Sequence, residues 1–426
     1  MPLALRAVSA CGTHTSGSAP QGDLNQRASL NTREVQHVAP MASNLSSMNR
    51  LFFLDWLRIL AFSTLVLYHV GMYYVSWSFH VKSPFAGPGL EPWMKLTEPW
   101  RLSLLFMVSG AATSLMLKSG PIRALVRRRS AQLLVPLLCG VVLVVPPQSY
   151  YEVVQKFGYS AGYLDFLRLY FSGYRGFCST GQCLILPTWN HLWFLPYLWV
   201  YTLLVCGVVA LWPGARQAAT QAVEAALRGV WLLLIPIAVI LSVRLTLFER
   251  FPTTHALFGD WFSHAMYLSM FVVGGALAAS KVMWERLAVM RRPALLLAVV
   301  FWAVLVFIRP AKPLEHGVVA IYQWSALVAA FGFSTAYLNH DSPLRSRLTE
   351  AVFPVYILHQ TVIIVGSQLL LPMRLPPAVE APILILLTFV LSYAGYELVR
   401  RIKFLRPWFG LKAVNDEVRR PLHGGA

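Results

Sequence analysis

Three ionisable residues lie within one long apolar stretch of the sequence, where they could do chemistry. Residues 50–74, with the sequence RLFFLDWLRILAFSTLVLYHVGMYY, contain Asp55, Arg58 and His69. A stretch of this length predicts a helix that crosses a membrane, which requires about 20 apolar residues. Ionisable groups at such depth are costly, so they usually face a protein interior or a wet cavity and mark function. We therefore expect this helix to carry functional side chains.

The spacing of Arg58 and His69 places them on one face of the expected helix. They are eleven residues apart, which at about 100° and 1.5 Å per residue leaves them within roughly 20° of each other and about 16 Å apart along the axis. An arginine binds anionic groups well, and a histidine titrates near neutral pH and can act as a general base or as a nucleophile. A structural interpretation stays open, in which Asp55 neutralises Arg58, Arg58 reaches the membrane surface, and His69 is a packing contact.

The composition is that of a helical membrane protein. The chain has 426 residues, of which 57% are hydrophobic and 13% are charged, whereas soluble proteins have about 25% charged residues. The net charge of +18 is explained by basic loops. Five cysteines are too few for a scaffold built on disulfides. The sequence contains no Gly-rich phosphate loop and no cluster of metal ligands, which argues against an ATP-driven pump and against a metal site.

We expect an all-α, polytopic bundle of about ten membrane spans. The predicted domains are a disordered cytoplasmic tail at 1–49, which could reflect a choice of start site, a membrane domain at 50–404 and a basic cytoplasmic tail at 405–426. Residues 146–190 are expected to form the largest loop. The fourth expected span begins at His191, and the other nine cover about 50–74, 100–117, 133–145, 230–247, 261–279, 293–308, 318–338, 351–371 and 381–399.

The distribution of basic residues orients these spans. With ten spans, 25 of the 36 lysines and arginines fall on the side of the two termini and 11 on the other side. Because cytoplasmic loops are richer in basic residues, both termini are predicted to be cytoplasmic and the loop at 146–190 to face outward.

Several short strings recur in a definite order and spacing. They are Arg58 and His69 with ten residues between them, FMVSG at 106–110, the basic stretch before Pro136, HLWFL at 191–195 and VYILHQ at 355–360. Together they resemble the acyltransferase 3 family of integral-membrane acyltransferases. HLWFLPYL and YILHQ are most similar to the branch named glucan biosynthesis protein C.

This resemblance implies an O-acyltransferase of the bacterial inner membrane. Such enzymes move an acyl group, commonly acetyl or succinyl, from cytoplasmic acyl-coenzyme A to a hydroxyl of a glycan or another extracytoplasmic acceptor. The donor is a co-substrate, and neither a bound cofactor nor nucleic acid is expected. The resemblance assigns the catalytic histidine to His69 and its partner arginine to Arg58. Whether His69 acts as general base or accepts the acyl group stays open, as does the partner of its second ring nitrogen.

One family feature differs in this chain. The family often has an Arg-x-x-Arg pair before the proline of the third helix, but here Arg129 is followed three residues later by Gln132. The adjacent Arg127, Arg128 and Arg129 can still attract the phosphates of the donor.

Further candidates for substrate binding are Arg101, His191, Trp193 and His359, each of which could instead be an interfacial anchor or a packing residue. Asp260 and His264, four residues apart, could bind a sugar. In the outer loop, Cys178 and Cys183 flank a glycine-containing turn and are predicted to form a disulfide, the alternative being two free thiols.

Two other functions are compatible with the same residues. A secondary transporter could use His69 and His359 as a proton relay, although we find no correspondence between the two halves of the sequence. Alternatively, the protein could pass the acyl group to a separate soluble partner.

Overall fold

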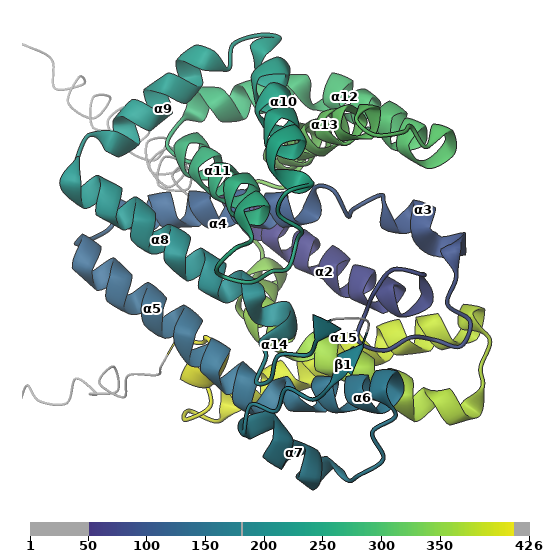
Figure 1. The fold of residues 1–426 in the computed structure, drawn as a ribbon. Coiled ribbons are helices and arrows are strands. Elements are labelled where there is room, and N and C mark those ends of the chain that lie inside the picture. Colours follow the sequence, from purple (N-terminus) through teal and green to yellow (C-terminus); the bar gives the residue numbers. More distant parts are fainter. Residues whose placement is uncertain (1–50, 180–181, 413–426) are drawn as a thin grey trace, which may run out of the picture. The chain divides into compact units, whose positions relative to one another are not determined.

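The computed structural model describes residues 51–179 and 182–412, and within them the fold is helical apart from one short hairpin (Figure 1). The predicted tail at 1–49 and residues 413–426 lie outside this part of the chain. The hairpin pairs β1 (Cys178–Ser179) with β2 (Gln182–Cys183), and a disulfide joins Cys178 to Cys183. The longer helices are α2 (Phe52–Tyr74), α4 (Arg101–Leu117), α5 (Ile122–Cys139), α6 (Pro146–Phe157), α7 (Tyr163–Phe171), α8 (Phe194–Leu211), α9 (Ala215–Ala226), α10 (Trp231–Val243), α11 (Trp261–Leu277), α12 (Lys281–Ala303), α13 (Leu314–Tyr337), α14 (Pro343–Leu370) and α15 (Pro377–Arg401).

The helices confirm a polytopic membrane protein. Among the described residues, seven helices are long and apolar enough to cross a membrane, and a bent pair formed by 122–144 and 146–157 makes up to eight. Two shorter apolar helices, α4 and α11, lie where the sequence predicts the second and sixth spans. The total of ten spans stays a prediction.

Helix α2 is the centre of the bundle, packed against α4, α13, α14 and α15. It runs parallel to α14 in a constant register, although the two helices are about 290 residues apart in sequence. Asp55 forms an ion pair with Arg345 near the start of both helices, and His69 contacts His359 fourteen residues further along each of them. The registered contact extends over about 21 Å, which is most of the thickness of a bilayer core.

Helices α4 and α11 approach each other closely through glycines. A Cβ atom on Gly110 would overlap the carbonyl oxygen of Phe271, and one on Gly274 would overlap the carbonyl oxygen of Met107. Small residues allow such backbone contact between membrane helices. The FMVSG string therefore has a packing role at its glycine, while its Phe106 is fully buried among aromatic rings.

The region between α5 and α8 is more ordered than the sequence suggests. Residues 146–190, expected as a loop, contain α6 and α7, which pack on each other through a buried aromatic cluster. A π-helical turn at Gly140–Val144 and prolines 146 and 147 separate α5 from α6, and the axis bends by 44° there. Proline and π-helical turns are common causes of such kinks. The bend places α6 beside the end of α14.

The glycine contact gives a first prediction. Gly274→Ala should lower the thermal unfolding temperature in detergent, with a cost of about 1–3 kcal/mol, because the backbone at Met107 has little room to move. Gly207→Ala in α8 is the matched control, since nothing lies within 4 Å of its added Cβ. Equal unfolding temperatures for the two variants would show that the α4–α11 contact is not tight.

Candidate active site

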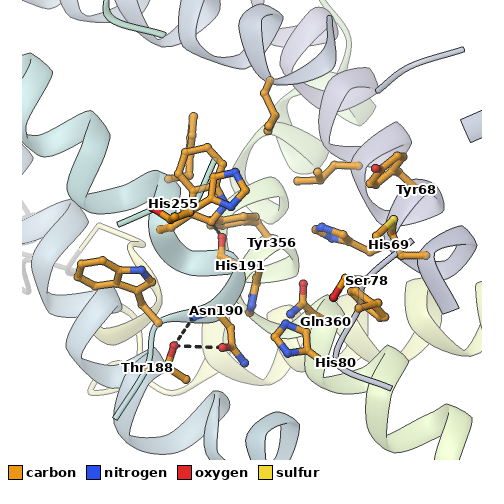
Figure 2. Close-up of a pocket in the computed structure, with 18 of the residues that line it drawn as sticks. Tyr68, His69, Ser78, His80, Thr188, Asn190, His191, His255, Tyr356 and Gln360 are labelled. Carbon is orange, nitrogen blue, oxygen red and sulfur yellow. Dashed lines mark hydrogen bonds between the residues drawn. The ribbon is translucent and has the colours of Figure 1, made fainter. Parts of the chain in front are cut away.

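A cavity of about 430 Å³ lies at the end of α2 that contains Tyr74. Its walls come from α2, α4, α6 and α14 together with the loops at 78–80, 188–193 and 254–255. Figure 2 shows that His69, His80 and His191 surround the same space. The cavity therefore brings together residues from six separate parts of the sequence, at 65–80, 101–105, 152–156, 188–194, 254–255 and 356–360.

The contacts of His69 fix which of its ring nitrogens carries the proton. In α14, Nδ1 of His359 lies 2.6 Å from the carbonyl oxygen of Tyr356, which can only accept a hydrogen bond. The neutral His359 ring therefore carries its proton on Nδ1 and accepts at Nε2. That Nε2 lies 2.8 Å from Nδ1 of His69, so His69 donates from Nδ1. Its Nε2 is left with a lone pair and no hydrogen-bond partner among the described residues, as a base or a nucleophile requires.

His191 is held firmly by α14. Its Nε2 donates to the carbonyl oxygen of Ile357 at 3.0 Å, and the hydroxyl of Tyr356 donates to the His191 carbonyl at 2.5 Å. Its Nδ1 is buried without a partner in the part of the chain that the structure describes. The ring centroids of His191 and His359 are 5.1 Å apart. His191 thus offers one unused acceptor at the wall of the cavity.

A third imidazole, that of His80, has a carboxylate partner. Its Nδ1 lies 2.5 Å from Oε2 of Glu152, and the other oxygen of Glu152 accepts from Lys156 at 2.6 Å. Glu152 reaches the cavity because of the bend between α5 and α6. Neither residue stands out in the sequence, because His80 lies in a loop and Glu152 lies in a segment that lacks a long apolar run.

A network of amides links three elements at one side of the cavity. Oε1 of Gln148 accepts from Asn190 and from Gln360, each at 3.0 Å, and Nε2 of Gln148 donates to Thr361 at 2.7 Å. Thr361 in turn donates to the carbonyl oxygen of Val144 at 2.6 Å. The network satisfies these buried polar groups and fixes α6 and α14 relative to the segment before α8.

A buried cation lies beside His69. Arg101 is only 6% exposed and stacks over the ring of Tyr68, at 3.2 Å from the centroid. Its Nε and Nη1 atoms have no hydrogen-bond partner among the described residues. A buried guanidinium with unused donors is a candidate for binding an anionic group.

Aromatic rings form a second wall. Trp193 stacks on His255 with a centroid distance of 4.0 Å. Burial lowers the pKa of His255 to about 4, so this ring is neutral at physiological pH. Asp260 holds its loop by accepting from the backbone N–H groups of Thr254 and His255 and capping α11 at Ser263.

Asp260 and His264, the pair considered for sugar binding, both make contacts within the fold. The carboxylate of Asp260 is fully buried and accepts three backbone hydrogen bonds. His264 bonds to Tyr201 and to the carbonyl oxygen of Leu257 and stacks on Tyr197. Neither residue lines the cavity.

Arg58 lies at the opposite end of α2, and its partner differs from the one considered in the sequence. Asp55 pairs with Arg345, while Nη2 of Arg58 donates to the carbonyl oxygen of Thr349 at 3.1 Å. Arg129 lies close enough for its charge to interact with that of Arg58. Both arginines have a buried Nε without a partner among the described residues. Arg127 and Arg128 are exposed.

A comparison with protein families identifies the chain. Residues 51–397 match the model of the acyltransferase domain called Acyl_transf_3. The chain belongs to the acyltransferase 3 family. Searches of curated proteins and of solved structures found no match. The sequence-based prediction of an acyltransferase is confirmed, while the branch within the family is not established.

The structure of this acyltransferase groups five of the candidate residues around one cavity. His69, His191, Trp193 and Arg101 line it, and His359 stands directly behind His69. Arg58 and Arg129 form a separate pair, while Cys178 and Cys183 lie in the hairpin outside the cavity lining. Sequence reasoning missed His80, Glu152 and Gln148, because their contacts join segments that are far apart in the chain.

The tautomer of His69 leads to a second prediction. His359→Phe removes the acceptor for Nδ1–H of His69, so the rate of acyl transfer should fall about 100-fold. His359→Gln offers a side-chain oxygen to the same N–H, although its amide cannot take the proton, and it should keep a rate about tenfold above that of His359→Phe. Steady-state release of free thiol measures both. Equal rates for the two variants would show that His359 does not orient His69.

Proposed function

We propose that this acyltransferase moves an acyl group from cytoplasmic acyl-coenzyme A to a hydroxyl group of a glycan or a related extracytoplasmic acceptor. The observation that carries the proposal is that Nε2 of His69, inside a cavity, has no hydrogen-bond partner in residues 51–179 and 182–412. Arg58 lies at the other end of the same helix. In this proposal His69 is the reacting group, as general base or as acyl carrier, and Arg58 serves the donor.

Two cations with unused N–H groups support a binding site for the acyl donor at the end of α2 that carries Arg58. Arg58 from α2 and Arg129 from α5 are half-buried, and each has a buried Nε without a partner in the described part of the chain. Guanidinium groups suit phosphates because their donors match the oxygen geometry. Helices α2 and α5 thus supply two guanidinium groups, as the missing Arg-x-x-Arg pair would. The exposed Arg127 and Arg128 add to the local positive charge.

The acceptor end is supported by the lining of the cavity. The stacked rings of Trp193 and His255 offer an apolar face next to unused polar atoms, which is the combination that small-molecule sites generally have. Arg101 could stabilise the oxyanion of the tetrahedral intermediate. Its buried charge also favours an acyl group that carries a carboxylate, such as succinyl, over acetyl.

The proposal includes a topology with ten spans and both termini in the cytoplasm. The family branch that it favours is the one named glucan biosynthesis protein C, in the bacterial inner membrane. On this topology Arg58 lies toward the cytoplasm and the cavity with His69 opens toward the outside, consistent with a donor and an acceptor that enter from opposite sides.

The decisive assay uses purified protein with acetyl- or succinyl-coenzyme A and a panel of acceptors that includes glucose, linear β-glucan oligosaccharides and glycerol. Thiol release that depends on the acceptor supports the enzyme. The competing hypothesis is a proton-coupled transporter that uses the bonded His69–His359 pair as a relay. Ion-coupled uptake of a solute by proteoliposomes without thiol release would favour it.

His69→Ala should abolish acyl transfer in this assay. Loss of a general base or of a nucleophile typically costs 100-fold or more in rate. Size-exclusion elution and thermal unfolding in detergent check that the variant is folded. A folded His69→Ala protein with a rate within about twofold of the unmodified enzyme would exclude His69 as the reacting group.

Arg58→Lys should raise the KM for acyl-coenzyme A about tenfold or more. Lysine keeps the charge but lacks the planar, forked donors that bind phosphate. Arg127→Lys is the matched control, because Arg127 is exposed on α5 and its replacement should leave KM nearly unchanged. An unaltered KM and kcat in Arg58→Lys would mean that Arg58 only bonds to Thr349.

A further inference from the structure

The pair formed by His80 and Glu152 is the part of the cavity that the proposed function leaves unused. Both residues line the cavity that contains His69, but they come from a loop and from α6. We propose that His80 and Glu152 form a second catalytic pair, in which His80 removes the proton from the acceptor hydroxyl while His69 carries the acyl group. This inference rests on the proposed function and assigns the two roles that a single histidine would otherwise have to share.

The contacts of the two histidines favour this division of roles. The Nδ1 atom of His80 lies 2.5 Å from a carboxylate oxygen of Glu152. A carboxylate at this position fixes the tautomer with Nε2 unprotonated and stabilises the imidazolium that forms when Nε2 takes a proton. His69 has a neutral imidazole at the equivalent position, which orients the ring but gives much less stabilisation to a positive charge. His80 is therefore the better base, and His69 is suited to act as a nucleophile.

The geometry leaves His80 available for the reaction. Its side chain is 21% exposed, and its Nε2 has no hydrogen-bond partner among the described residues. The second oxygen of Glu152 accepts a hydrogen bond from Nζ of Lys156, so both carboxylate oxygens are bonded. These two contacts keep the carboxylate ionised. The pair thus presents one reactive nitrogen to the cavity.

A purely structural role, in which the pair ties the loop to α6, is already filled by other contacts. The backbone N–H of Lys82 donates to Oε1 of Gln155 at 2.6 Å, and Nε2 of Gln155 donates to the carbonyl oxygen of Lys82 at 2.9 Å. Nζ of Lys82 also bonds to the carbonyl oxygens of Met72 and Val75. The loop is therefore fixed two residues away from His80 without any help from Glu152.

The first step transfers the acyl group to the enzyme. Nε2 of His69 attacks the thioester carbon, the carbon–sulfur bond breaks, and the coenzyme A thiolate leaves and takes a proton from solvent. His69 passes its Nδ1 proton to Nε2 of His359, which leaves a neutral acyl-imidazole beside an imidazolium.

The second step transfers the acyl group to the acceptor. Nε2 of His80 takes the hydroxyl proton as the hydroxyl oxygen attacks the acyl carbon. The carbon–nitrogen bond breaks, its electron pair returns to Nε2 of His69, and His359 gives the proton back to Nδ1. His80 then releases its proton to solvent, so the net reaction is acyl-coenzyme A plus alcohol to ester plus coenzyme A.

The test compares an acceptor that needs a base with one that does not. Hydroxylamine attacks acyl groups as a neutral amine, whereas a sugar hydroxyl must lose its proton. The variants are His80→Gln and Glu152→Gln, assayed with the carbohydrate acceptor that the unmodified enzyme uses fastest and, separately, with hydroxylamine. The direct reaction of hydroxylamine with the thioester is subtracted using the His69→Ala protein. Gln155→Ala is the structural control, because it breaks the tie between the loop and α6 and leaves the pair intact.

His80→Gln and Glu152→Gln should each lower the rate of acyl transfer to carbohydrate at least about 100-fold. Their rates of transfer to hydroxylamine should stay within about threefold of the rate of the unmodified enzyme. Gln155→Ala should keep both rates within about threefold. The inference is overturned if the two rates fall together, which would make the pair structural, or if carbohydrate transfer persists, which would leave His69 as the base. An unmodified protein that releases no thiol with any acceptor would instead overturn the proposed function itself.

Discussion

The pairing of α2 with α14 is the constraint on which the site depends. Two polar contacts hold these parallel helices in register, Asp55 with Arg345 near one end and His69 with His359 fourteen residues further along each helix. Ionisable groups within a bilayer have few alternative partners, so a shift of one residue would leave both pairs unsatisfied. The register that satisfies the charges is also the register that places His359 behind His69 and leaves Nε2 of His69 facing the cavity. Stability and chemistry here use the same contacts.

Many of the membrane-spanning helices can be predicted from the sequence, because they are long stretches of apolar composition. The ranges of α2, α4, α11 and α13 agree with the expected spans to within a few residues. The resemblance supplied Arg58 and His69, and the depth of His359 in its span suggested a functional role. The helices α6 and α7 were missed because short amphipathic helices lack a long apolar run.

The remaining misses are pairings between distant segments. Asp55 was considered as a partner for Arg58, three residues away, yet its partner is Arg345 from α14. A local sequence pattern favours the nearest opposite charge, whereas helix packing decides which charge is actually adjacent. For the same reason the sequence does not predict the pair of His80 and Glu152, which are 72 residues apart, or the approach of Arg129 to Arg58. Only the packing of the helices brings these residues together.

On the proposed function, the aromatic residues between the two ends of α2 separate a donor end of the bundle from an acceptor end. Phe62 lies one turn beyond Arg58, and its ring packs edge-on against Phe194 and Tyr356. The cavity extends along α2 only as far as Leu65, so it ends at this layer. Polar solutes and ions cross a layer of buried rings with difficulty, because they lose hydration and gain no partner. An acyl carrier at His69, just beyond the layer, would need only the narrow thioester arm of the donor to pass, while the phosphates stay with the arginines and the acceptor stays in the cavity.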